Sequence, residues 1–82
     1  MEYVVQFKPR ALKDIKSLQP DISDQIITKI EQLQDNLSGD VKKLTNFTPE
    51  YRLRVGQYRV LFEIEGNQVI IYRIKHRSDA YS

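Results

Sequence analysis

The hydrophobic residues near the N-terminus change their spacing within a few positions. Residues 3–7 place Tyr3, Val5 and Phe7 at alternate positions, which predicts a short strand with one apolar face. From Pro9, which suits the first turn of a helix, hydrophobic residues lie three apart up to a break at Gln19-Pro20. This pattern predicts a first helix with a stripe formed by Leu12, Ile15 and Leu18.

A longer stripe of hydrophobic residues predicts a second helix. The spacings of four, four, three and four describe one helical face, which comprises Ile22, Ile26, Ile30, Leu33 and Leu37. Pro20 is suited to open this helix, and Gly39 is the predicted C-cap. We expect the two helices to form a hairpin that packs on a sheet.

The hydrophobic period changes from about 3.6 to 2 in the second half of the chain. After a predicted connecting loop over residues 40–50, which carries Lys42 and Lys43, we expect strands at residues 51–55, 58–65 and 69–74. Two-residue turns at Gly56-Gln57 and Gly66-Asn67 join these strands as hairpins. The last strand is almost continuously apolar, which favours a central position in the sheet.

These elements define the predicted fold class. It is α+β with the order β-α-α-β-β-β, an antiparallel sheet meander that carries the N-terminal helical hairpin on one face. The length of 82 residues fits a single domain over residues 1–82. A chain of this size buries a core that only just outweighs chain entropy, so a permanent partner is compatible with it.

The composition argues against several classes of chemistry. The chain has no cysteine and one histidine, so we expect no disulfide scaffold, thiol nucleophile, metal site or cofactor. No apolar run reaches the roughly 18 residues of a membrane span. The N-terminus also lacks the pattern of a signal peptide, so we expect a cytoplasmic protein.

The formal net charge of +2 is distributed unevenly. Residues 1–40 hold five basic and seven acidic side chains, whereas residues 41–82 hold eight basic and four acidic ones. Five of the six arginines lie in the second half, and the planar fork of arginine pairs two phosphate oxygens at once. This half therefore suggests an anionic partner, nucleic acid first, although a solvated charged face has the same composition.

The turn at Gly56-Gln57 predicts which of these arginines lie together. It pairs Arg54 with Arg59 and puts both on one sheet face with Arg52. No acidic residue between positions 51 and 62 offsets their repulsion, which favours a face that grips an RNA or DNA backbone. The alternative is an edge strand that uses charge to prevent aggregation.

The same counting through the Gly66-Asn67 turn extends this face to the last strand. It pairs Arg59 with Ile74 and so adds Ile74 and His76 to the arginine face, unless a β-bulge reverses the register. A lone His is more often structural, and a Tyr near the chain end such as Tyr81 is more often a packing anchor. Beside an arginine face, however, Tyr, His and Arg together provide the proton transfers and charge stabilisation that metal-free RNA cleavage requires.

Several segments resemble the RelE branch of the RelE/ParE toxin superfamily. They are Phe7-Lys8-Pro9-Arg10-Ala11-Leu12-Lys13, Arg52-Leu53-Arg54, Gly56-Gln57-Tyr58-Arg59-Val60-Leu61-Phe62 and His76-Arg77-Ser78-Asp79-Ala80-Tyr81. The resemblance covers essentially the whole chain. A G-x-Y-R-hydrophobic strand followed by H-R-x-x-x-Y is fairly specific for the superfamily and less so for the branch. It implies a RelE/ParE-like, microbial RNase-like fold.

The resemblance also implies an activity. A toxin of a type II toxin–antitoxin system would enter the ribosomal A site and cleave mRNA there without a metal, because the 2′-hydroxyl attacks the adjacent phosphate and leaves a 2′,3′-cyclic phosphate. The implied catalytic residues are Arg54, Arg59, Arg77 and Tyr81. Arg59 and Arg77 would stabilise charge, and Tyr81 would stack on the base, transfer protons or do both. RNA binding is assigned to Arg52, Lys42, Lys43, Lys75 and His76.

The identity of the general base stays open at this point. Some members of the family carry lysines where this chain has Arg52 and Arg54. An arginine, with a pKa above about 12, is a poor general base. His76 or a group of the ribosomal RNA is therefore an alternative base.

The resemblance further implies partners and leaves two alternatives. The partners are a RelB-like antitoxin that wraps the toxin, the 30S A site with its mRNA and 16S rRNA, and operator DNA only through the antitoxin complex; no membrane is implied. One alternative is a ParE-like toxin that poisons DNA gyrase. The other is a catalytically inactive module whose arginine face binds an acidic antitoxin segment.

Overall fold

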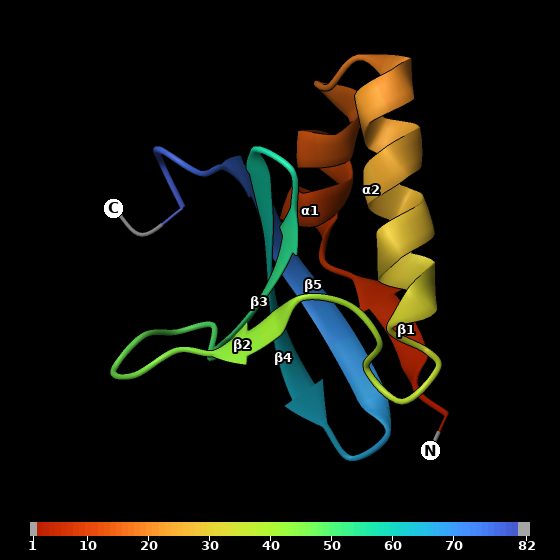
Figure 1. Cartoon of the computed structure of the whole chain (residues 1–82), viewed down its shortest axis with the longest axis vertical. Coiled ribbons are helices and arrows are strands. Elements are labelled where there is room, and N and C mark those ends of the chain that lie inside the picture. The colour runs from red at the N-terminus through yellow and green to blue at the C-terminus, as the bar shows by residue number, and fades with distance from the viewer. Residues whose placement is uncertain (1, 81–82) are drawn as a thin grey trace.

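The computed structural model describes residues 2–80, and this range forms two helices and five strands (Figure 1). In chain order they are β1 (Val4–Phe7), α1 (Pro9–Lys16), α2 (Pro20–Gln32), β2 (Val41–Lys43), β3 (Tyr51–Val55), β4 (Tyr58–Glu65) and β5 (Gln68–His76). Neither of these two helices is long and apolar enough to cross a lipid bilayer.

The strands form one sheet with the order β1-β5-β4-β3-β2. β3, β4 and β5 make the predicted antiparallel meander, and β1 joins it in parallel with β5, so the sheet is mixed. The predicted α+β class is confirmed, and β5 has the predicted interior position. The segment 40–50 is not a loop throughout, because β2 pairs with β3 and adds a strand to the predicted order.

The two helices lie on the same side of the sheet, and the core forms between them and the strands (Figure 1). Its largest fully buried side chains are Ile26, Ile30, Leu33, Leu53, Val60, Phe62, Val69 and Ile71. In α1, Ala11 is fully buried whereas Leu12 is 47% exposed, so the predicted stripe is wrong at Leu12. The spacing Ala11, Ile15, Leu18 follows the helical period more closely than the spacing from Leu12.

The end of α2 also differs from the sequence prediction. The helix ends at Gln32 with Leu33 as its C-cap, so Gly39 does not cap it. The chain turns at Asn36 and Leu37, which have positive φ values of 56° and 58°. Gly39 has a φ of 124°, and a Cβ built on it would lie 2.9 Å from Cδ1 of Leu53. Glycine is thus required there by the backbone angle and the close approach to β3.

The register of β3 and β4 agrees with the prediction, whereas that of β5 does not. Arg54 lies opposite Arg59, as predicted. A bulge shifts the pairing of β4 with β5 by one residue between Leu61 and Phe62. Arg59 therefore lies opposite Lys75 and not Ile74. Ile74 is buried in the main core. The bulge therefore puts Lys75 in the place on the arginine face that the sequence assigned to Ile74.

An ion pair between Asp14 and Arg73 joins α1 to β5. Nε of Arg73 donates to Oδ2 of Asp14 at 2.8 Å, and the Ile74 amide donates to the same oxygen at 3.0 Å. Partial burial alone raises the pKa of Asp14. The hydrogen bonds from Arg73 and Ile74 outweigh that effect, so the pKa lies below its ordinary value of 3.8. The ionised carboxylate is therefore the form that holds α1 on the sheet.

Replacing Asp14 with Asn should lower the free energy of unfolding at neutral pH by about 1–3 kcal/mol, because a charged hydrogen-bond acceptor is lost. The folded-state pKa of Asp14 is lowered, so this stabilisation is fully present above the unfolded pKa. It is lost as the pH falls through the lower folded pKa. Urea denaturation over a pH series should therefore show the wild-type and D14N stabilities converging under acid conditions.

Asp24→Asn is the matched control, because Asp24 is exposed on α2 and its side chain forms no hydrogen bond or ion pair within residues 2–80. We expect this variant to unfold like the wild type at every pH. An Asp14→Asn deficit that persists undiminished in strong acid would contradict the assigned role of the carboxylate.

Candidate functional site

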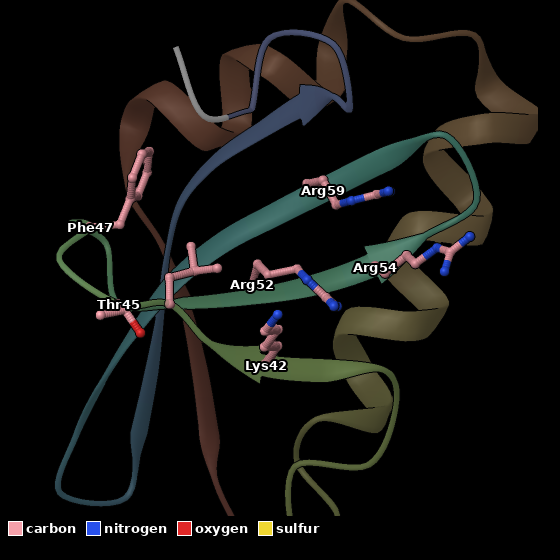
Figure 2. Close-up of a pocket in the computed structure, with 7 residues that line it drawn as sticks. Lys42, Thr45, Phe47, Arg52, Arg54 and Arg59 are labelled. Atoms are coloured by element: carbon pink, nitrogen blue, oxygen red, sulfur yellow. The ribbon is translucent and has the colours of Figure 1, made fainter.

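The face of the sheet opposite the helices carries an open pocket of about 460 Å³ (Figure 2). It lies over β2, β3 and β4 beside the loop that joins β2 to β3. Its lining residues are Lys42, Leu44, Thr45, Phe47, Arg52, Arg54 and Arg59. We call this set the cationic pocket, because four of its side chains are basic and no acidic side chain of residues 2–80 lines it.

Strand pairing brings the four basic side chains together. Lys42 of β2 lies opposite Arg52 of β3, and Arg54 of β3 lies opposite Arg59 of β4. Because side chains alternate between the faces of a strand, Arg52 and Arg54 point to the same side. Leu53 between them is fully buried on the helix side. The core thus determines which side chains line the pocket.

The arginines differ in how firmly they are held. Nη1 of Arg52 donates to the Asp40 carbonyl at 2.7 Å and to Asp40 Oδ1 at 3.2 Å, and its side chain is only 15% exposed. Nη1 of Arg59 donates to the carbonyls of Gly56 and Tyr58 at 3.1 and 2.9 Å. The remaining N–H groups of Arg59 stay available to a ligand, since guanidinium has five donors.

Arg54 is exposed and forms no ion pair with another of residues 2–80. The pocket therefore combines two oriented guanidinium groups, one exposed guanidinium and one amine. Such a group of cations attracts phosphate, and charge-assisted hydrogen bonds fix its oxygens. Thr45 adds a hydroxyl and Phe47 an aromatic ring at the wall of the pocket, which suits a nucleotide with both a phosphate and a base.

Two of the predicted residues, Lys75 and Arg77, do not line the pocket. Lys75 pairs with Arg59 across β4 and β5, so it lies on the same face beside the pocket. Arg77 is exposed, and its amide donates to the Gln57 carbonyl at 2.7 Å, next to the turn between β3 and β4. Tyr81 lies outside the described residues.

Two predicted RNA-binding residues lie away from the pocket. Lys43 pairs with Tyr51, so it points to the other side of the sheet, and its Nζ lies 3.6 Å from Glu50. His76 lies opposite Tyr58, whose ring it meets edge-on at 5.5 Å between centroids. The prediction that His76 lies on the arginine face is wrong, because the bulge moves it to the face that carries Tyr58.

Sequence reasoning missed Leu44, Thr45 and Phe47. These residues belong to the segment predicted as a plain loop, and they reach the pocket because β2 anchors the start of that segment against β3. Val41, Lys42 and Lys43 are too few to show an alternation, so no signal in the sequence marks this short strand. Among residues 2–80, no group of three His, Cys, Asp or Glu side chains is arranged to hold a metal ion.

Comparisons with known proteins agree with this architecture. A family model described as the ParE toxin of the type II toxin–antitoxin system parDE matches residues 5–81. Toxin RelE3 of Methanocaldococcus jannaschii is 34% identical, over 94% of this chain and 93% of the relative. The mRNA interferase toxin RelE of Escherichia coli K12 is 26% identical, over 100% of this chain and 93% of the relative.

Solved structures give the same result. The chain matches a RelB–RelE antitoxin–toxin complex from Methanococcus jannaschii with a TM-score of 0.73 and 34% identity, covering 88% of this chain and 89% of the other. It matches the RelBE2 toxin–antitoxin complex from Mycobacterium tuberculosis with a TM-score of 0.80 and 27% identity, covering 94% and 100%.

The chain belongs to the RelE/ParE superfamily of type II toxin–antitoxin toxins. Its relatives place it in the RelE branch of that superfamily, as the sequence resemblance implied.

Replacing Arg54 with Gln should weaken binding of a short single-stranded RNA, because the exposed guanidinium of the pocket is lost. If Arg54 contacts one phosphate, the slope of log affinity against log salt should become shallower by about 0.7. Fluorescence anisotropy over a salt series measures this slope.

Arg10→Gln, which removes an exposed arginine from α1 on the other side of the sheet, is the matched control. It should leave both the affinity and the slope unchanged. An equal loss in the two variants would mean that net charge, and not the pocket, attracts the RNA.

Proposed function

We propose that this toxin is a metal-independent endoribonuclease that cleaves mRNA in the A site of the ribosome. The observation that carries the proposal is the cationic pocket, in which four basic side chains line one open space and no acidic side chain of residues 2–80 does. The E. coli relative named an mRNA interferase supports the same activity at the level of the family.

The reaction we propose is an in-line attack within the RNA strand. The 2′-oxygen bonds to the adjacent phosphorus, the bond from phosphorus to the 5′-oxygen breaks, and the products are a 2′,3′-cyclic phosphate and a 5′-hydroxyl. Negative charge on the phosphoryl oxygens increases in the transition state, so fixed cations stabilise it more than the ground state.

Arg59 is best suited to stabilise that charge. Its hydrogen bonds to the Gly56 and Tyr58 carbonyls hold the guanidinium before substrate arrives, so little reorganisation accompanies the reaction. Arg54 and Arg52 position the strand through its phosphates. Arg77 contributes charge from the end of β5, and Tyr81 stacks on the base or donates a proton to the leaving 5′-oxygen.

We also propose a RelB-like antitoxin as the partner of this toxin, with operator DNA bound only by the complex of the two. The solved relatives that support this are RelB–RelE and RelBE2 complexes. The chain itself offers exposed apolar side chains on the N-terminal elements, since Val4 is 52% and Leu12 is 47% exposed.

Cell-free translation followed by primer extension on the messenger tests the activity. We expect cleavage only when ribosomes are present, at positions that correspond to the A site. Arg59→Ala should reduce the cleavage rate by about 10²–10³-fold, because one oriented donor to the transition state is removed. Arg10→Ala on α1 is the control and should cleave like the wild type.

An intact messenger with unaffected translation would overturn the nuclease proposal. Inhibition of DNA gyrase by the same preparation would then assign the chain the ParE-like activity. Cleavage that survives Arg59→Ala at the wild-type rate would leave the nuclease in place but remove the role given to Arg59.

A further inference from the structure

The cationic pocket contains three arginines, and none of them can accept the proton of a 2′-hydroxyl. A guanidinium stays protonated throughout the physiological range, so Arg52, Arg54 and Arg59 supply charge and hydrogen bonds only. His76, the histidine considered as a base, lies on the other face of the sheet beside Tyr58. Thr45 carries a neutral hydroxyl that is no stronger a base than the group it would deprotonate.

Lys42 is the one side chain among the described lining residues that can both release and accept a proton. It comes from β2, lies directly opposite Arg52, and points into the same space as the three arginines (Figure 2). An amine that has lost its proton has a free electron pair, which a guanidinium does not offer. Its pairing with Arg52 keeps it beside the guanidinium groups of the pocket.

The surroundings of Lys42 leave its amine available. The charged groups that face it are Arg52 and Arg54 from β3 and Arg59 from β4, all of them cations. Asp40, the acidic residue nearest in the chain, directs its carboxylate to Arg52 at 3.2 Å. The neighbouring Lys43 differs from Lys42, because it lies on the other face of the sheet and its amine is paired with Glu50 at 3.6 Å.

We infer that Lys42 is the general base of this toxin, an inference that rests on the proposed nuclease function. The neutral amine takes the proton from the 2′-hydroxyl as the 2′-oxygen bonds to phosphorus. The bond to the 5′-oxygen breaks, and that oxygen takes a proton from Tyr81 or from water. Solvent then removes the proton from Lys42 and returns a proton to Tyr81 if Tyr81 gave one, so protons balance over the cycle.

Lys42→Arg tests this inference because it keeps the positive charge and removes the ability to accept a proton. The variant and the wild type are compared in single-turnover cleavage on ribosomes programmed with mRNA, over a pH series from mildly acidic to alkaline. Binding to the same ribosomes is measured separately. Lys29→Arg, on the exposed side of α2, makes the same chemical change away from the pocket.

The wild-type rate should rise with pH, because the amine must lose its proton before it acts. Lys42→Arg should bind ribosomes as the wild type does, cleave about 10²–10⁴-fold more slowly, and lose this rise with pH. Lys29→Arg should retain both the rate and the profile.

Two results would overturn the role of Lys42 as general base. Both can be distinguished from a failure of the proposed nuclease function. Wild-type cleavage with an unchanged rate and pH profile in Lys42→Arg would assign Lys42 a charge role only. A rate loss matched by an equal loss of ribosome binding would make Lys42 a binding residue. Absence of cleavage by the wild type itself would instead remove the nuclease function, and the base with it.

Discussion

Leu53 and Val60 face each other across β3 and β4, and their burial decides which side chains occupy the opposite face of the sheet. Each contributes about 1.5–3 kcal/mol through burial, whereas the repulsion between Arg54 and Arg59 costs up to about 1 kcal/mol. A slip of one residue would move the arginines into the core. The core therefore holds together a set of like charges that would otherwise separate, and the anionic ligand proposed for the pocket would offset their repulsion.

The sequence was sufficient for elements whose local signals agree with one another. The Gly56-Gln57 turn and the strict alternation around it define the ladder between β3 and β4, and the long apolar stripe defines α2. The bulge at Leu61 and Phe62 left no such signal. Leu61 pairs with Arg73 and Phe62 with Ile71, so the extra residue is Tyr72 of β5, and no glycine or proline marks it in the sequence.

The same reasoning explains how far the site could be predicted. The three arginines follow from one turn, but the positions of Lys42 and His76 depend on pairings that the sequence does not specify. β2 has only three residues, too few for a period to stand out, and its pairing with β3 separates Lys42 from Lys43. His76 changes face because every residue after the bulge does. Thr45 and Phe47 reach the pocket through tertiary contacts alone.

The parallel pairing of β1 with β5 has a consequence for how the molecule is made. Val4 lies beside Gln68 and Phe7 beside Ile71, so the first strand of the sheet pairs with the last one. Contacts over so large a separation form late, after the local hairpins. During synthesis, β1 has no partner until nearly the whole chain has emerged, whereas the hairpin of β3 and β4 that carries Arg54 and Arg59 is complete earlier. In a growing chain, the hairpin of β3 and β4 with its arginines is thus complete before β1 can close the sheet.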